Sequence, residues 1–156
     1  MNVRRMRSLI YTTVFLVSLL IPGTLWARPQ TAGIGIILGQ PTGLSLKFWL
    51  DKTSAIDVAA AWSFLPSGAL YAHADYLYHF YNLFPIKEGA LPLYVGVGGS
   101  VTIMANPTIG IRIPVGIDYL FHNLPLDAFL EVGLGVSVFP ATQVLGTGGI
   151  GIRYNF

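Results

Sequence analysis

The chain has 156 residues, of which 53% are hydrophobic and only 10% are charged, with a formal net charge of +2. A soluble domain typically carries about 25% charged residues, so this composition excludes an ordinary water-exposed surface unless the apolar side chains are covered. The absence of cysteine excludes a disulfide framework and a thiolate metal site. The length suggests one domain.

The first 27 residues are expected to form a secretory signal peptide. Arg4, Arg5 and Arg7 precede an uncharged apolar stretch over 9–21, and Ala27 offers a small residue for cleavage. The apolar stretch is shorter than the roughly 20 residues that a spanning helix needs, which favours removal over retention as an anchor. These arginines supply the positive balance, so the net charge does not indicate nucleic acid, and no such partner is expected.

After the signal peptide, over residues 28–156, apolar residues alternate with polar or small ones. A period of two is typical of β-strands whose two faces meet different surroundings. Eight such runs are predicted, over 33–39, 44–50, 56–64, 70–80, 91–103, 109–121, 126–138 and 145–156. The connections between them are rich in turn-forming residues, and the longest is 81–90. Such short connections exclude parallel crossovers, so neighbouring strands should pair antiparallel.

The charged residues of the runs lie on the polar face of the alternation. With one histidine they form the predicted interior set: Lys47, Asp57, His73, Asp75, Arg112, Asp118, Asp127, Glu131 and Arg153. An eight-stranded interior is only just wide enough for side chains, so it could not hold the bulky apolar residues of all eight strands. The polar face should therefore point inward and the apolar face toward lipid, in a closed barrel without unpaired edges.

Aromatic residues near the strand ends support this orientation. Trp62 and Phe64 lie near one predicted rim. The other predicted rim collects Phe48, Tyr78, Phe80, Tyr119, Phe121, Tyr154 and Phe156. Amphipathic rings favour the two membrane interfaces, so the sequence predicts two aromatic girdles.

The last strand carries the most specific signal. Ile150, Ile152, Tyr154 and Phe156 occupy alternate positions, and the final residue is aromatic. This pattern resembles the C-terminal assembly signal of the small eight-stranded outer-membrane barrels of the OmpA and OmpX type. The resemblance covers residues 28–156. It implies a bacterial outer-membrane location, both termini in the periplasm and recognition by the barrel assembly machinery. The predicted outer loops are short, which argues against an adhesin.

Two patterns could indicate a catalytic or cofactor site. Residues 146–151 match a dinucleotide-binding GxGxxG, but the helix that this motif requires does not follow. His73 and Asp75 share a strand face, whereas His73 and His79 would stand roughly 20 Å apart, too far for one metal. The lipid A deacylases among membrane barrels place their catalytic residues on the lipid-facing side, whereas these candidates point inward. We therefore expect no cofactor, no metal and no catalysis.

The sequence thus predicts an all-β, eight-stranded, antiparallel up-and-down transmembrane barrel, monomeric, with a structural role in the envelope. Arg112 and Arg153 should lie among Asp118, Asp127 and Glu131, because they belong to three neighbouring strands, and should plug the lumen. The alternative is a narrow pore or small-ligand site, for which the inward glycines would leave room. A lipid-modifying outer-membrane enzyme is a second alternative.

Overall fold

The structure, a computed structural model, describes residues 31–156 except 41, 63–69 and 104–105. The predicted signal peptide lies outside the described residues. The described chain forms eight strands: β1 (Ala32–Gln40), β2 (Thr42–Trp49), β3 (Ser54–Trp62), β4 (Leu70–Phe80), β5 (Leu93–Ile103), β6 (Thr108–Leu120), β7 (Leu126–Phe139) and β8 (Gln143–Asn155). Among these residues, no helix is long and apolar enough to span a membrane.

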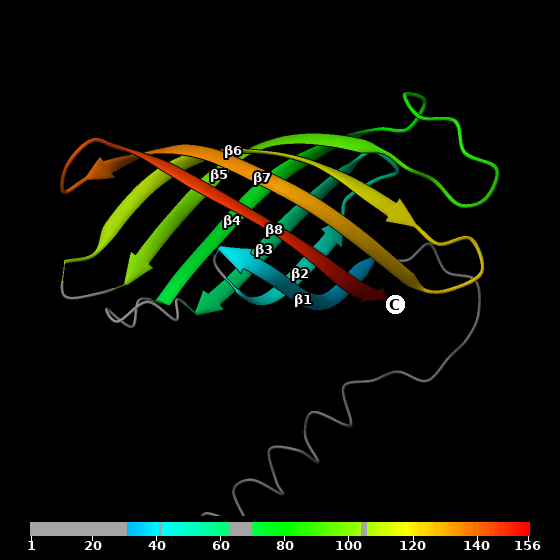
Figure 1. Cartoon of the computed structure of the whole chain (residues 1–156), viewed down its shortest axis with the longest axis horizontal. Helices are drawn as coiled ribbons and strands as arrows, with labels where there is room; N and C mark the ends of the chain where they lie inside the picture. The colour runs from blue at the N-terminus through cyan, green and yellow to red at the C-terminus, as the bar shows by residue number, and fades with distance from the viewer. Residues whose placement is uncertain (1–30, 41, 63–69, 104–105) are drawn as a thin grey trace, which may run out of the picture.

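The strands pair in chain order and close into one barrel (Figure 1), because β8 pairs antiparallel with β1 as well as with β7. Phe156 completes the closure, since its backbone N–H donates to the carbonyl of Ala32 at 2.8 Å. The ladders are regular except for a register shift between β6 and β7 at Ile109 and Gly110. The predicted fold class is confirmed, and the strand boundaries differ by at most two residues at each described end.

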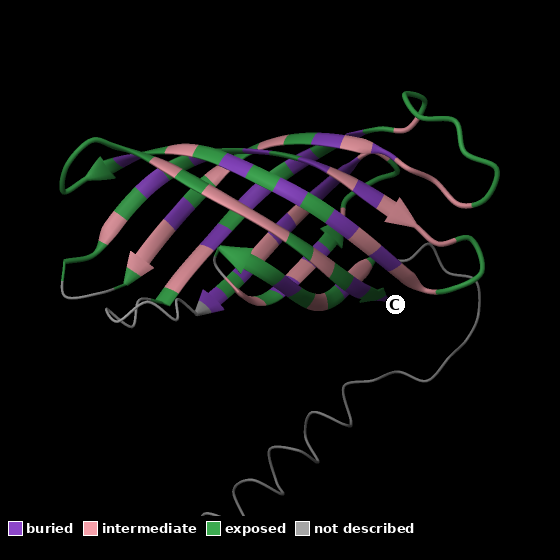
Figure 2. Cartoon of the chain, in the orientation of Figure 1, coloured by how far each residue is buried: buried purple, intermediate pink, exposed green. Residues whose placement is uncertain are grey.

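The two faces of the barrel wall differ in kind. Large apolar side chains such as Ile34, Leu44, Ile113 and Leu134 point outward and are exposed, whereas most of the alternate positions face the lumen and are buried or half-buried. Figure 2 shows this alternation as a change of burial class from residue to residue along most strands. The strands form in this pattern because each sequence offers one apolar face and one small or polar face.

The barrel has two ends, which we name by the chain termini. The terminal rim carries the start of β1, the end of β8 and the turns 50–53, 81–92 and 121–125. The opposite rim carries the end of β1, the starts of β2 and β4, and the turn 140–142. The segment 81–92 is the longest connection and is held by an isolated bridge between Ala90 and Leu120.

Glycines on the inner wall make room for the large side chains of the lumen. A Cβ at Gly151 would lie 2.3 Å from the ring of Phe129, and one at Gly116 would lie 2.4 Å from the ring of Tyr94. Gly151 pairs with Phe129 across β7 and β8, and Gly116 pairs with Tyr94 across β5 and β6, so each glycine lies opposite the ring that it accommodates. The narrow lumen is therefore filled by ring and charged side chains lying over glycine backbone.

Candidate functional site

The candidate site is the lumen itself. The inward positions of six strands carry all nine residues that the sequence places inside, and each side chain is buried. They form two clusters, which we name by their arginines: the Arg153 cluster toward the terminal rim and the Arg112 cluster further inside.

Arg153 on β8 lies at the centre of the first cluster. Its Nε donates to Asp127 Oδ1 at 2.9 Å and its Nη2 donates to Asp118 Oδ1 at 3.1 Å. Its Nη1 contacts Asp57 on β3, across the lumen. The guanidinium lies 3.9 Å from the ring centroid of Phe129, a cation–π contact. One cation thus joins carboxylates from three strands.

Lys47 and His79 extend the Arg153 cluster toward the terminal rim. Lys47 Nζ pairs with Asp118 and lies 2.9 Å from His79 Nε2. His79 Nδ1 lies 3.0 Å from the carbonyl oxygen of Thr53, which can only accept, so Nδ1 carries the ring proton. His79 Nε2 then accepts from Lys47 and lies 3.1 Å from Asp118 Oδ2, to which the same ammonium donates. Lys47 Nζ also lies 4.5 Å from the ring centroid of Trp49.

Arg112 on β6 organises the second cluster. Its Nη2 donates to Glu131 Oε1 at 2.5 Å, and its Nε lies 3.4 Å from Asp75 Oδ2. Its Nη1 contacts His73 Nδ1 and donates to the hydroxyl of Tyr71 at 3.3 Å. Glu131 Oε2 also accepts from the hydroxyl of Tyr94 at 2.9 Å, a contact over Gly116 of β6, which pairs with both residues.

The partners differ in part from the predicted ones. Arg153 does lie between Asp118 and Asp127, but it also reaches Asp57. Among the described residues, Arg112 pairs with Glu131 and Asp75 rather than with Asp118 or Asp127. Sequence reasoning left several lumen side chains out of the set: Ser45, Tyr71, His79, Tyr94 and Asn155. Their inward position in the alternation was the available signal.

Two hollows flank the clusters. A mouth cavity of about 780 Å³ opens at the terminal rim, lined among others by Trp49, Leu50, Tyr81 and Phe121. Burial, with Asp118 and Asp51 nearby, raises the pKa of Tyr81 to about 12. On the side of the Arg112 cluster that faces the opposite rim lies a space of only about 10 Å³, roughly the room for one water. The ion pairs thus separate a wide mouth from a water-sized space.

Most of the predicted girdle residues that the structure describes lie on the outer face, as does the C-terminal signal. Phe48, Tyr78, Phe80, Tyr154 and Phe156 are exposed near the terminal rim, and Ile150 and Ile152 are exposed along β8. Tyr119 and Phe121 are half-buried there. Of the second predicted girdle, Phe64 and the side chain of Trp62 lie outside the described part of the chain. Phe139, which was not predicted, is exposed at the opposite rim.

These features define a class: a closed, eight-stranded up-and-down barrel with an apolar exterior and an ion-paired lumen. Among solved structures, the chain is similar to the N-terminal β-barrel domain of Pseudomonas aeruginosa OprF, with a TM-score of 0.63 and 15% sequence identity over 83% of this chain and 100% of that one. The expected likeness to the small outer-membrane barrels is thereby confirmed for the fold. No protein-family model matches the sequence, and neither does a curated protein.

Proposed function

We propose that the chain is an integral outer-membrane β-barrel with a structural role in the cell envelope, its lumen closed by the two clusters. The observation that carries the proposal is the inverted distribution of side chains, with charges buried inside and large apolar residues exposed outside. Soluble monomers rarely expose contiguous apolar patches larger than a few hundred Å². A bilayer would cover this exterior, and the closed ladder supplies the paired backbone that hydrocarbon requires.

Gel migration with and without boiling tests this proposal. The extracted protein should run as a compact, detergent-stable band when unheated and shift to a slower band after boiling. The native band should fractionate with the outer membrane. A detergent-free, water-soluble monomer recovered from the periplasm would contradict the proposal.

The narrow pore remains the alternative, favoured by the wide mouth cavity at the terminal rim. The clusters argue against conduction, because an ion would have to separate buried pairs that hold each other at hydrogen-bond distance. Planar-bilayer recordings of the purified barrel decide between them. We expect no regular conductance steps, and reproducible steps would favour the pore.

A lipid-modifying activity has less support. The histidines of the strands, His73 and His79, are buried in the lumen and engaged with charged partners, away from the lipid-facing surface. Lipid A from cells with and without the protein should therefore give the same mass spectrum. A mass difference that depends on the protein would overturn this expectation.

We also propose that the C-terminal strand is read by the barrel assembly machinery during insertion, and that the barrel is a monomer. Phe156 supports the first point, because its backbone closes the barrel while its side chain is 60% exposed and free for recognition. Phe156→Ala should lower the amount of native barrel assembled in cells and leave refolding of the purified chain in detergent unchanged. Equal losses in both would indicate a packing role instead.

A further inference from the structure

The lumen carries an excess of negative charge. Among the described residues, its buried charged side chains comprise three cations, Lys47, Arg112 and Arg153, and five carboxylates: Asp57, Asp75, Asp118, Asp127 and Glu131. The two buried histidines do not fill the difference. His79 Nε2 lies near both Lys47 Nζ and Asp118 Oδ2, and a charged ammonium can only donate, so Nε2 accepts from Lys47, which also donates to Asp118. His73 Nδ1 likewise faces an Arg112 nitrogen that can only donate, so each ring has a lone pair in use and is neutral. Two negative charges are therefore left without a cation.

Part of the uncompensated charge lies at Asp75. Its side chain is 1% exposed, yet neither carboxylate oxygen has a hydrogen-bond partner among the described residues. The nearest positive group, Arg112 Nε, lies 3.4 Å away and is itself without a hydrogen-bond partner. A buried carboxylate in this state is unfavourable unless a further cation reaches it.

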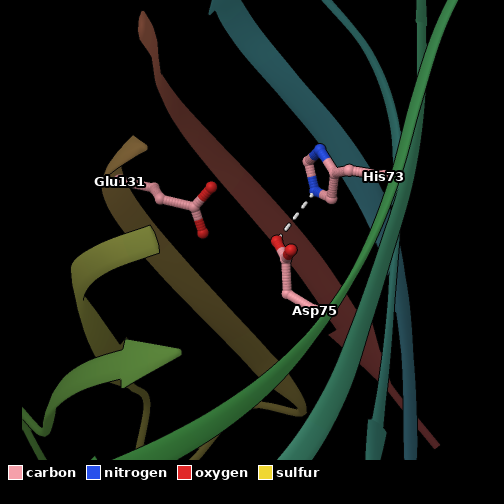
Figure 3. Close-up of side chains that lie close together, drawn as sticks. All are labelled: His73, Asp75 and Glu131. Carbon is pink, nitrogen blue, oxygen red and sulfur yellow. Dashed lines mark ion pairs between the residues drawn. The ribbon is translucent and has the colours of Figure 1, made fainter. Parts of the chain in front are cut away.

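His73 and Glu131 complete a set of ligand atoms around this carboxylate. One atom from each of His73, Asp75 and Glu131 lies within 4.8 Å of the others. Figure 3 shows His73 and Asp75 side by side on β4, with the carboxylate of Glu131 on β7 directed toward them. His73 is buried, and its Nε2 has no hydrogen-bond partner among the described residues; it lies 3.5 Å from Asp57 Oδ2 and 3.6 Å from Asp75 Oδ2. Two ligands of a tetrahedral zinc ion stand about 3.4 Å apart, so this pair is already near the required spacing.

We propose that His73, Asp75 and Glu131 bind one divalent transition-metal ion, such as Zn²⁺, in competition with the guanidinium of Arg112. A divalent ion would balance the two excess charges while all three lumen cations stay charged. One imidazole and two carboxylates suit zinc better than Mg²⁺ or Ca²⁺, which prefer oxygen ligands. The water-sized space beside His73 and Glu131 has room for a fourth ligand, one water.

Arg112 competes because its contact with His73 and metal binding exclude each other. A metal on Nε2 requires the ring proton to move to Nδ1, and Nδ1–H cannot face the Nη1 donor of Arg112. The guanidinium must therefore turn away from His73, and its hydrogen bond from Nη1 to the hydroxyl of Tyr71, already present at 3.3 Å, involves none of the three metal ligands. Glu131 is released from Arg112 in the same movement and closes on the ion.

Calorimetric titration of the refolded, detergent-solubilised barrel with Zn²⁺ tests the proposal. The wild-type chain should bind one ion, and Arg112→Gln should bind it about tenfold more tightly or better, because a competing positive charge is removed. Asp75→Asn should weaken binding by about 10–100-fold or more. His122→Gln is the matched control, since His122 is exposed in the turn after β6, and it should bind like the wild-type chain.

The unfolding midpoint in urea provides a second measurement in case a variant folds poorly. Zn²⁺ should raise the midpoint of the wild-type barrel and of His122→Gln, a chelator should reverse the rise, and Asp75→Asn should show none. The proposal fails if zinc leaves the wild-type midpoint unchanged, or if Asp75→Asn responds fully. It also fails if Mg²⁺ acts as strongly as Zn²⁺, because the imidazole would then not be a ligand.

Discussion

Gly151 shows how single residues set the shape of the lumen. It pairs with Phe129 across β7 and β8, and an added Cβ would lie 2.3 Å from two carbons of that ring. Phe129 cannot simply turn aside, because its ring also lies under the guanidinium of Arg153. Gly151→Ala should therefore destabilise the barrel by about 1–3 kcal/mol, the usual range for overpacking.

Gly146 on the same strand is the matched control for this prediction. An added Cβ there meets no atom within 4 Å. Urea unfolding of the two refolded variants should show a lower midpoint for Gly151→Ala and nearly the wild-type midpoint for Gly146→Ala. Equal midpoints would mean that Phe129 can repack, and that the lumen is less tightly filled than its contacts indicate.

Arg153 is the residue on which the most charges depend. Removing its guanidinium leaves Asp57, Asp118 and Asp127 buried together, and among the described lysines and arginines Lys47 is then the one still paired with them. Breaking a buried pair by deleting one partner typically costs about 3–5 kcal/mol. Arg153→Met, which keeps part of the side-chain volume, should lower the free energy of unfolding by at least this amount.

Arg153→Lys separates charge from geometry in the same experiment. Lysine keeps the positive charge but lacks the planar fork that reaches several carboxylates at once. We expect its unfolding free energy, measured in urea, to lie between those of the wild-type chain and Arg153→Met. If Arg153→Met proves as stable as the wild-type barrel, the cluster contributes nothing to stability.

At the scale of elements, Asp51 organises the turn between β2 and β3. It accepts from the backbone N–H of Thr53 at 2.7 Å, the hydroxyl of Thr53 at 2.9 Å and the N–H of Ser54 at 2.8 Å. Hydrogen bonds from Thr53, then Ser54, lower the pKa of Asp51 to about 2. Because the folded pKa is depressed, the stabilisation is present above the ordinary value of 3.8 and is lost as the pH falls through about 2.

An NMR titration of the refolded barrel checks this sign. The carboxyl carbon of Asp51 and the amide protons of Thr53 and Ser54 should change together near pH 2. In Asp51→Asn the two amides should show no such step. A midpoint near 3.8 for Asp51 would mean that the turn does not hold its carboxylate in this way.

The strands could be predicted from sequence, whereas most lumen partners could not. Alternation alone reports which face of a run such as 126–138 is apolar, because the period of two is local. The pairing of Arg112 with Glu131 could be predicted, because the two residues belong to strands that follow each other in the chain and therefore lie side by side. The contacts of Arg153 with Asp57 and of Lys47 with Asp118 cross the lumen, and they depend on strand tilt and register, which distant residues determine jointly.

The same reason explains why the candidate metal site was not predicted. Within one strand, the spacing of His73 and His79 is too long for a shared ion. Glu131 comes from β7, three strands further along the barrel wall, and faces His73 only because the barrel closes. A sequence pattern can place each of these side chains inside, but the depth at which each lies follows from the register of all the ladders.

For the whole molecule, the decisive question is which solvent meets the outer face. Leu134, in the middle of β7, is 68% exposed, and Val144, at the start of β8 near the opposite rim, is 84% exposed. In a bilayer, arginine costs about 2–4 kcal/mol at the midplane and about 0–1 kcal/mol near an interface. Urea unfolding of the barrel refolded in lipid vesicles should therefore show a large loss of unfolding free energy for Leu134→Arg and a small one for Val144→Arg.

In water both arginines would be solvated and neither would change the stability, so two small effects would place the apolar face outside the membrane. Two equal large losses would instead locate Val144 at the depth of Leu134, and the barrel would then sit in the bilayer shifted toward its terminal rim.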